Sequence, residues 1–102
     1  MNGPKENNDS KKRSRLEVIS DIIRIIHEKG GKIKPTHLMY KANLSHKTMK
    51  IYLGELIKNG LVKEQAASKD DKTKRLIVLT PKGVDFSLQY SKIKEFETTF
   101  GI

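Results

Sequence analysis

Residues 43–60 read NLSHKTMKIYLGELIKNG, and this stretch decides how the rest of the chain is interpreted. Ser45 predicts the start of a helix, because a serine hydroxyl at the N-cap accepts a hydrogen bond from a free amide of the first turn. Gly60 predicts its end, since the residue just past a helix often takes a left-handed conformation in which a Cβ would clash. Apolar residues recur between them at helical spacing and predict one buried stripe: Met49, Leu53, Leu56 and Ile57.

The opposite face of this predicted helix is basic. At about 100° per residue, the side chains that point away from the stripe are Lys47, Thr48, Ile51 and Lys58, with Lys50 at the margin. A helix with an apolar back and a basic front suits the major groove of DNA, so we interpret residues 45–59 as a recognition helix. Lys47 or Lys50 can donate to guanine O6 and N7. Ile51 either packs on a thymine methyl or contacts a neighbouring element.

Gly54 lies in the middle of the same helix and has two readings. Either it allows close packing of the helix, or it simply weakens the helix by up to ~1 kcal/mol.

Two further helices are predicted before this stretch. Ser14 and Glu17 form a capping box, in which each side chain satisfies a backbone amide of the other residue, and the glycines at 30–31 end that helix. Pro35 opens a second, short helix, because a proline at the first position loses no hydrogen bond. Only a tight turn then remains before Ser45, and two helices joined by such a turn form a helix-turn-helix unit.

The first of these helices is unusually apolar. Its two neighbouring stripes cover about half of the circumference, more than a surface helix usually buries. We therefore expect this helix to contact both its own domain and something else. One stripe consists of Leu16, Ile19, Ile23 and Ile26, and the other of Val18, Ile22 and Ile25.

After Gly60 the periodicity changes. Residues 61–65 and 75–79 are rich in β-formers and predict two strands. The polar segment between them is too long for a two-residue turn, so we expect an extended hairpin over residues 66–75. The hairpin is basic through Lys69, Lys72, Lys74 and Arg75. Asp70 and Asp71 either offset this charge or shape the turn.

Thr80 and Pro81 start the last helix as N-cap and first helical residue. Val84 and Leu88 are expected to face the domain core. A second apolar seam, expected on the other side, is formed by Phe86, Ile93, Phe96 and Phe100. Each phenylalanine could gain about 1.5–3 kcal/mol on burial, which favours a partner, most simply a second copy of the chain. Alternatively the helix folds back on the first helix of a monomer.

The composition limits the class of protein. A chain of 102 residues supports one small domain, and its net charge of +9 favours a polyanionic partner. The chain has no cysteine, hence no disulfide and no thiolate metal site. No run reaches the ~18 apolar residues of a membrane span, and the N-terminus lacks the apolar core of a signal peptide. We expect a soluble, cytoplasmic, nucleoid-associated protein.

Enzyme chemistry finds no support in the sequence. The histidines are His27, His37 and His46, and no two of them are spaced as a helical zinc pair. There is no glycine-rich phosphate loop, no nucleophile elbow and no obvious pair of catalytic carboxylates. We expect no enzyme activity, no metal, no cofactor and no small-molecule ligand.

Residues 1–13 are polar and without periodicity, which predicts a disordered basic tail. Lys11, Lys12 and Arg13, with Arg15 just beyond, either follow a phosphate backbone or minor groove or simply solubilise the chain. The expected organisation is a tail over residues 1–13, a domain over 14–83, and a self-associating helix over 84–102.

Two stretches carry a family resemblance: YKANLSHKTMKIYLGELIKNGLV at residues 40–62 and LIVLTPKG at residues 76–83. From residue 14 to about residue 90 the chain resembles winged helix-turn-helix proteins. It looks most like small archaeal winged-helix regulators, including ArnR-type proteins and chromatin-like DNA binders of Sulfolobus. The resemblance implies an α+β fold with a three-helix core, a two-stranded β-wing and a C-terminal dimerisation helix.

The same resemblance implies a homodimer on double-stranded DNA, with the last helices paired as an antiparallel coiled coil. The residues it assigns to the groove are His46, Lys47, Lys50 and Ile51, and those it assigns to the wing are Lys72 and Lys74. Three functions remain open: a sequence-specific transcriptional regulator, an architectural DNA binder with low specificity, and a module for protein–protein or RNA contact. In the first two, lysine contacts to phosphate supply most of the affinity. The predicted DNA-contacting residues are Ser45, His46, Lys47, Lys50, Ile51, Lys69, Lys72, Lys74 and Arg75.

Overall fold

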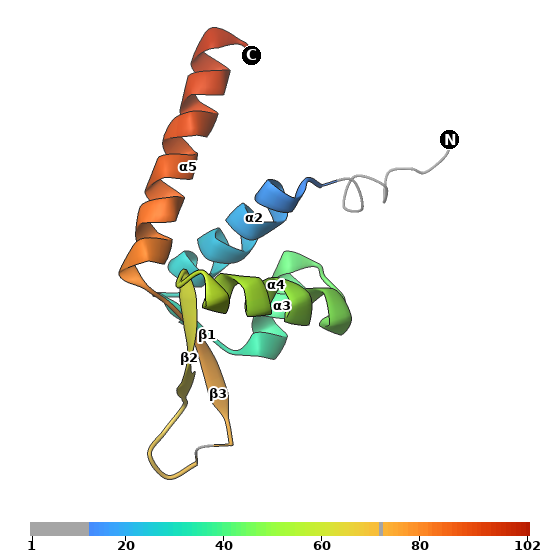
Figure 1. Cartoon of the computed structure of the whole chain (residues 1–102), viewed down its shortest axis with the longest axis vertical. Helices are drawn as coiled ribbons and strands as arrows, with labels where there is room; N and C mark the ends of the chain where they lie inside the picture. Colours follow the sequence, from blue (N-terminus) through green and yellow to red (C-terminus); the bar gives the residue numbers. More distant parts are fainter. Residues whose placement is uncertain (1–12, 72) are drawn as a thin grey trace, which may run out of the picture.

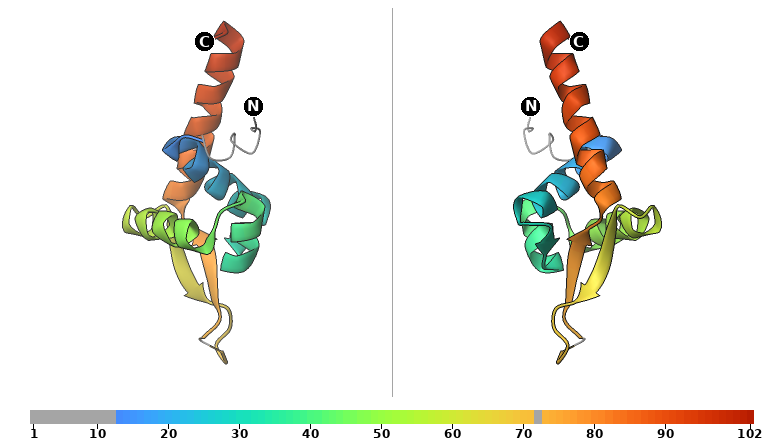
Figure 2. Two further views of the ribbon diagram at one scale, coloured as in Figure 1. Left: turned by 90° about the vertical axis from the view of Figure 1, so that its right-hand side faces the viewer. Right: turned by 90° about the vertical axis from the view of Figure 1, so that its left-hand side faces the viewer.

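The structure is a computed structural model that describes residues 13–71 and 73–102 (Figure 1). The chain forms an α+β domain whose elements, in order, are α2 (Arg15–Glu28), β1 (Lys32–Ile33), α3 (Pro35–Ala42), α4 (His46–Lys58), β2 (Val62–Ala66), β3 (Arg75–Leu79) and α5 (Pro81–Phe100). The β2–β3 hairpin and the far end of α5 point in opposite directions from a body made by the other helices (Figures 1 and 2). The principal extents are 50 × 32 × 22 Å.

The helices begin where the sequence predicts. Ser14 Oγ accepts a hydrogen bond from the Glu17 amide at 3.1 Å, and the Glu17 carboxylate accepts one from the Ser14 amide at 3.0 Å, which completes the capping box. These hydrogen bonds stabilise the ionised carboxylate and lower the pKa of Glu17. Pro35 opens α3, and Ser45 Oγ accepts a hydrogen bond from the Thr48 amide at 3.1 Å.

The sheet has one strand more than predicted. Its order is β1-β3-β2, and both pairings are antiparallel. β1 is only two residues long, with Ile33 opposite Ile77, and two residues are too few to show an alternating pattern in the sequence. β1 therefore attaches the hairpin to the helical body. The expectation of a two-stranded wing holds for the hairpin but not for the whole sheet.

α2 is the centre of the core, and the expectation for its second stripe is wrong. The helix packs against α3, α5 and the sheet, so both stripes are covered by the chain itself. Ile22, Ile23 and Ile26 have no exposed surface. Of the predicted stripe residues only Leu16, at the open end of the helix, is exposed, at 49%. A central helix has neighbours on more sides than a surface helix, which accounts for its wide apolar arc.

The first turn of α5 is held tightly against the hairpin. Gly83 is buried, and a Cβ at this position would lie 2.3 Å from the carbonyl oxygen of Leu61 and 2.5 Å from a methyl carbon of Leu79. The Thr80 hydroxyl also accepts a hydrogen bond from the Gly83 amide at 3.1 Å. The LTPKG junction thus fixes the direction in which α5 leaves the sheet, and the expected boundary between residues 83 and 84 falls inside one continuous helix.

The predicted faces of α5 need correction. Phe86 packs against the core cluster instead of facing away from it, and Leu88 is 57% exposed instead of buried. The apolar seam of α5 therefore contacts the body of the protein at Phe86. Beyond this residue the helix extends away from the body. Further along, Ile93, Phe96 and Phe100 are exposed at 53, 54 and 64%.

In α4 the apolar stripe is nearly as predicted. Met49 and Leu56 are buried and Leu53 packs against the core, but Ile57 is 39% exposed and lies at the edge of the stripe. Tyr52 also packs against the core cluster, on the flank towards α2.

Candidate nucleic-acid interface

One flank of α4 borders a hollow of about 490 Å³, referred to below as the α4 hollow. The N-terminal part of α3 and strand β2 form its other walls. Its polar lining comes from His46, Lys50, Thr36 and Glu64, and its apolar lining from Pro35, Met39, Met49, Leu53, Gly54 and Ile57. The hollow therefore combines a mostly apolar floor with basic side chains from α4.

A second hollow of about 430 Å³, the wing hollow, adjoins the first. It is bordered by the start of α3 and by the hairpin, through Lys34, Ala67, Thr73, Lys74, Arg75 and Leu76. Pro35 and Thr36 line both hollows. A concave surface thus runs from α4 across the start of α3 to the wing, and a rod-shaped partner lying along it would touch all three elements.

Four of the predicted DNA-contacting residues line the two hollows. His46 and Lys50 line the α4 hollow, and Lys74 and Arg75 line the wing hollow, so the fold brings these four together on one surface. Lys47 and Ile51 are exposed but line neither hollow; they lie on the outer face of α4.

The other predicted residues have different positions. The Ser45 hydroxyl caps α4 and also donates to the Thr48 hydroxyl at 2.9 Å. Lys69 is exposed on the hairpin loop, beside a separate shallow hollow. Lys72 lies outside the described residues.

Three neighbours at the start of α3 also line the wing hollow but were not among the predicted DNA-contacting residues: Lys34, Pro35 and Thr36. The sequence shows them only as a helix start, because their place between α4 and the wing depends on how α3 crosses α4. Glu64, also missed, adds one carboxylate to an otherwise basic lining.

The hairpin loop has its own hydrogen bonds. The Asp71 carboxylate accepts the amide and the hydroxyl of Thr73, and the Asp71 amide donates to Ser68 Oγ at 3.1 Å. The bonds from Thr73 lower the pKa of Asp71. The Ala67 amide donates to the Lys74 carbonyl at 2.8 Å and closes the loop. Of the two readings for this acidic pair, Asp71 therefore shapes the turn.

Arg13, predicted as the last residue of the disordered tail, is instead held by the domain, as is Arg15 just beyond it. Arg13 donates to the Asp21 carboxylate at 2.7 Å and to the Ala42 carbonyl at 3.0 Å. Arg15 pairs with Glu55 of α4, which raises the pKa of Arg15. Both guanidinium groups thus link the start of α2 to the helix-turn-helix unit. The expectations for Lys11 and Lys12 lie outside the described residues.

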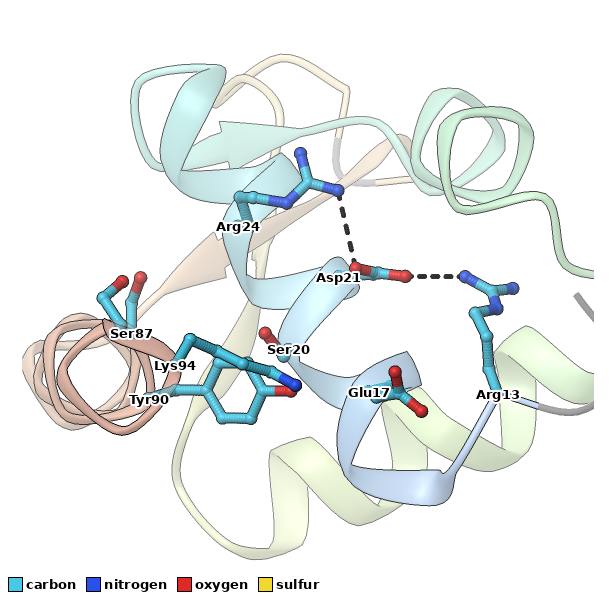
Figure 3. Close-up of a pocket in the computed structure, with 9 residues that line it drawn as sticks. Arg13, Glu17, Ser20, Asp21, Arg24, Ser87, Tyr90 and Lys94 are labelled. Atoms are coloured by element: carbon cyan, nitrogen blue, oxygen red, sulfur yellow. Dashed lines mark hydrogen bonds and ion pairs between the residues drawn. The ribbon is translucent and has the colours of Figure 1, made fainter. Parts of the chain in front are cut away.

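A polar hollow of about 400 Å³ also lies between α2 and α5 (Figure 3). Asp21 lies between Arg13 and Arg24, at 2.7 and 3.5 Å (Figure 3). Lys94 lies over the Tyr90 ring, 5.5 Å from its centroid. Interactions with Tyr90 and Glu97 raise the pKa of Lys94. Because acidic and basic groups are mixed here, this hollow suits a polyanion less well than the surface beside α4.

Within residues 13–71 and 73–102, no three His, Cys, Asp or Glu side chains are grouped closely enough to hold a metal ion. No helix in the same part of the chain is long and apolar enough to cross a membrane.

Residues 12–98 match the winged helix-turn-helix family, and the chain belongs to that family. It is 35% identical over 86 residues to MJ0290, an uncharacterised protein of Methanocaldococcus jannaschii. This match covers 84% of the chain but only 35% of MJ0290, so the chain spans about a third of that archaeal relative.

Two solved structures have the same fold. One is Sso10a-2, a DNA-binding protein from Sulfolobus solfataricus, with a TM-score of 0.68 and 20% identity over 86% of this chain and 85% of Sso10a-2. The other is F93 from STIV, a winged-helix DNA-binding protein, with a TM-score of 0.66 and 16% identity over 84% of this chain and 92% of F93. The predicted resemblance to archaeal winged-helix proteins is confirmed.

Proposed function

We propose that the chain is a transcriptional regulator that binds double-stranded DNA as a homodimer. The recognition helix α4 enters the major groove, and the wing follows the phosphate backbone. The observation that carries this proposal is the concave surface from α4 to the wing, which has basic side chains at both ends: Lys50 at one, and Lys74 and Arg75 at the other. Sso10a-2 and F93, which share the fold, are both DNA-binding proteins.

Phosphate contacts account for the affinity in this proposal. Each lysine or arginine that neutralises a phosphate releases a condensed counterion, so affinity falls as salt rises. We add Lys34, which lies at the junction of α3 and the wing, to the residues proposed to contact phosphate. The net charge of +9 adds long-range attraction to a duplex.

Dimerisation is proposed for the outer half of α5. Ile93, Phe96 and Phe100 lie there at spacings of three and four residues, and the rings of Phe96 and Phe100 are 4.7 Å apart. Burying each of these side chains could contribute about 1.5–3 kcal/mol. A second copy fits best as the partner, because a two-fold axis places the same seam against itself. Phe86 packs against the core of its own protomer, so it can meet the partner only at the base of the seam.

A second candidate function is supported by the composition of α4. Residues 46–58 read HKTMKIYLGELIK and include no asparagine, glutamine or arginine. Those residues make most bidentate contacts to base edges, whereas a lysine ammonium is a point charge that suits phosphate equally well. This composition favours an architectural DNA binder with low sequence specificity.

Duplex binding measured against salt tests the DNA-binding proposal. We expect the wild-type affinity to fall steeply with salt, and Lys50→Glu to weaken binding strongly without lowering the melting temperature. Lys92→Glu is the matched control, because it makes the same charge reversal at an exposed position on α5. If both variants bind like wild type, the α4 surface is not the interface.

Binding to unrelated duplexes separates the remaining functions. A footprint confined to few genomic sites supports the regulator, and even coating of unrelated duplexes supports the architectural binder. A wild-type chain without salt-sensitive duplex binding contradicts both and leaves a protein–protein or RNA module.

A further inference from the structure

Among the described residues, two glycines lie inside helices, and the fold accounts for only one of them. Gly83 in α5 is required because a Cβ would collide with the Leu61 carbonyl. Apart from its two neighbours in the chain and the backbone of its own helix, a Cβ on Gly54 in α4 would have no atom within 4 Å, and Gly54 is not among the residues with positive φ. Glycine favours a helix less than any residue except proline. Neither packing nor backbone conformation therefore explains a glycine at position 54, and the reading in which it allows close packing within the fold is wrong.

The position of Gly54 suggests an external reason. It lines the α4 hollow together with Lys50, one turn before it, and Ile57, one turn after it. Leu53 and Met39 extend the apolar lining. A partner lying in this hollow could approach the backbone of α4 at Gly54 more closely than at any neighbouring position with a side chain.

We propose that Gly54 is a specificity-determining residue that admits a thymine methyl group against the backbone of α4. The C5-methyl of thymine is the apolar group that a base pair presents in the major groove, and Ile57 and Leu53 provide an apolar wall for it. Lys50 then donates to a neighbouring phosphate or purine. The occupant is duplex DNA because basic residues surround the apolar floor: His46 and Lys50 in the same hollow, and Lys34, Lys74 and Arg75 in the adjoining one. This inference rests on the proposed function.

The test compares two duplexes of about two helical turns. One is alternating A·T, and the other carries deoxyuridine in place of thymine and so lacks every methyl. Wild type should bind the deoxyuridine duplex about fourfold more weakly for each thymine methyl that the protein buries in the A·T duplex. Gly54→Ala should raise the melting temperature, bind the thymine duplex about tenfold more weakly than wild type, and hardly distinguish the two duplexes.

Ser91→Ala is the matched control. Ser91 is exposed on α5, so this change also favours a helix but lies outside the α4 hollow. It should keep the wild-type affinity and the wild-type response to deoxyuridine. If Gly54→Ala binds both duplexes as wild type does, or if wild type binds them equally, the role of Gly54 is refuted while DNA binding stands. A wild-type chain that binds neither duplex overturns both the inference and the proposed function.

Discussion

α2 and α5 both carry many large apolar side chains, yet the fold treats them differently. α2 lies between α3, α5 and the sheet, and its valine and isoleucine side chains are all buried. α5 is anchored at Gly83 and Phe86 and then leaves the body, so that Ile93, Phe96 and Phe100 are more than half exposed. In the sequence each helix shows more apolar surface than a surface helix of a small domain needs. Excess apolar surface on a helix therefore indicates that the helix needs neighbours, but not whether the chain itself supplies them.

The largest expected effect is in α2. Ile22 is fully buried, so Ile22→Ala should lower the free energy of unfolding by about 2–5 kcal/mol through reduced burial and a new cavity. Chemical denaturation followed by circular dichroism measures this change. Ile93→Ala, which truncates an equally large side chain on the outer half of α5, is the control and should cost far less at low protein concentration. If both substitutions lowered the free energy of unfolding equally, the two helices would not differ in their contribution to stability.

A substitution at the base of α5 should destabilise the fold, as a substitution in α2 does. Gly83→Ala places a methyl against the Leu61 carbonyl, and because a backbone atom has little room to move, we expect a loss of about 1–3 kcal/mol. Gly54→Ala should instead stabilise the fold by up to ~1 kcal/mol, since its Cβ enters open space. Thermal unfolding of the two variants gives both signs in one experiment. A neutral Gly83→Ala would show that α5 can shift away from the hairpin.

The outer half of α5 should affect self-association rather than folding. Ile93→Asp combined with Phe96→Asp should change the stability of the isolated protomer by no more than about 0.5 kcal/mol, because both side chains already face solvent. The wild-type chain should sediment as a dimer and the variant as a monomer, since a charge buried in an apolar interface is costly. Ser91→Asp with Thr98→Asp, which adds the same two charges at exposed positions on the opposite face of the helix, is the control. Sedimentation of wild type as a monomer at tens of micromolar would refute the dimer.

The smallest expected effect is on the pH dependence of folding stability, through Glu17 at the start of α2. The folded state lowers the pKa of Glu17 through its hydrogen bonds with Ser14, so the carboxylate stabilises the helix fully above its unfolded pKa. That contribution should disappear as the pH falls through the lowered, folded-state value. Thermal unfolding of wild type and Glu17→Gln, from neutral pH down through this acidic range, measures the effect. The melting temperatures should differ at neutral pH and become equal at low pH. A difference independent of pH would mean that the charge of Glu17 is not involved.

The sequence alone determined the local elements, because their signals are local. Ser14, Ser45 and Thr80 cap helices within a few residues of themselves, and Gly60 ends α4 with a φ of 76°. The order of these elements was enough to predict the winged helix-turn-helix fold.

Only the tertiary structure decided which surfaces are covered and which residues meet. It covered the second stripe of α2, turned Phe86 inward and Leu88 outward, and added β1 to the sheet. It also placed Lys34 and Thr36 between α4 and the wing. These outcomes depend on the angles at which helices cross and leave the sheet. Contacts between residues far apart in the chain set those angles, and the periodicity of a single helix or strand does not reveal these contacts.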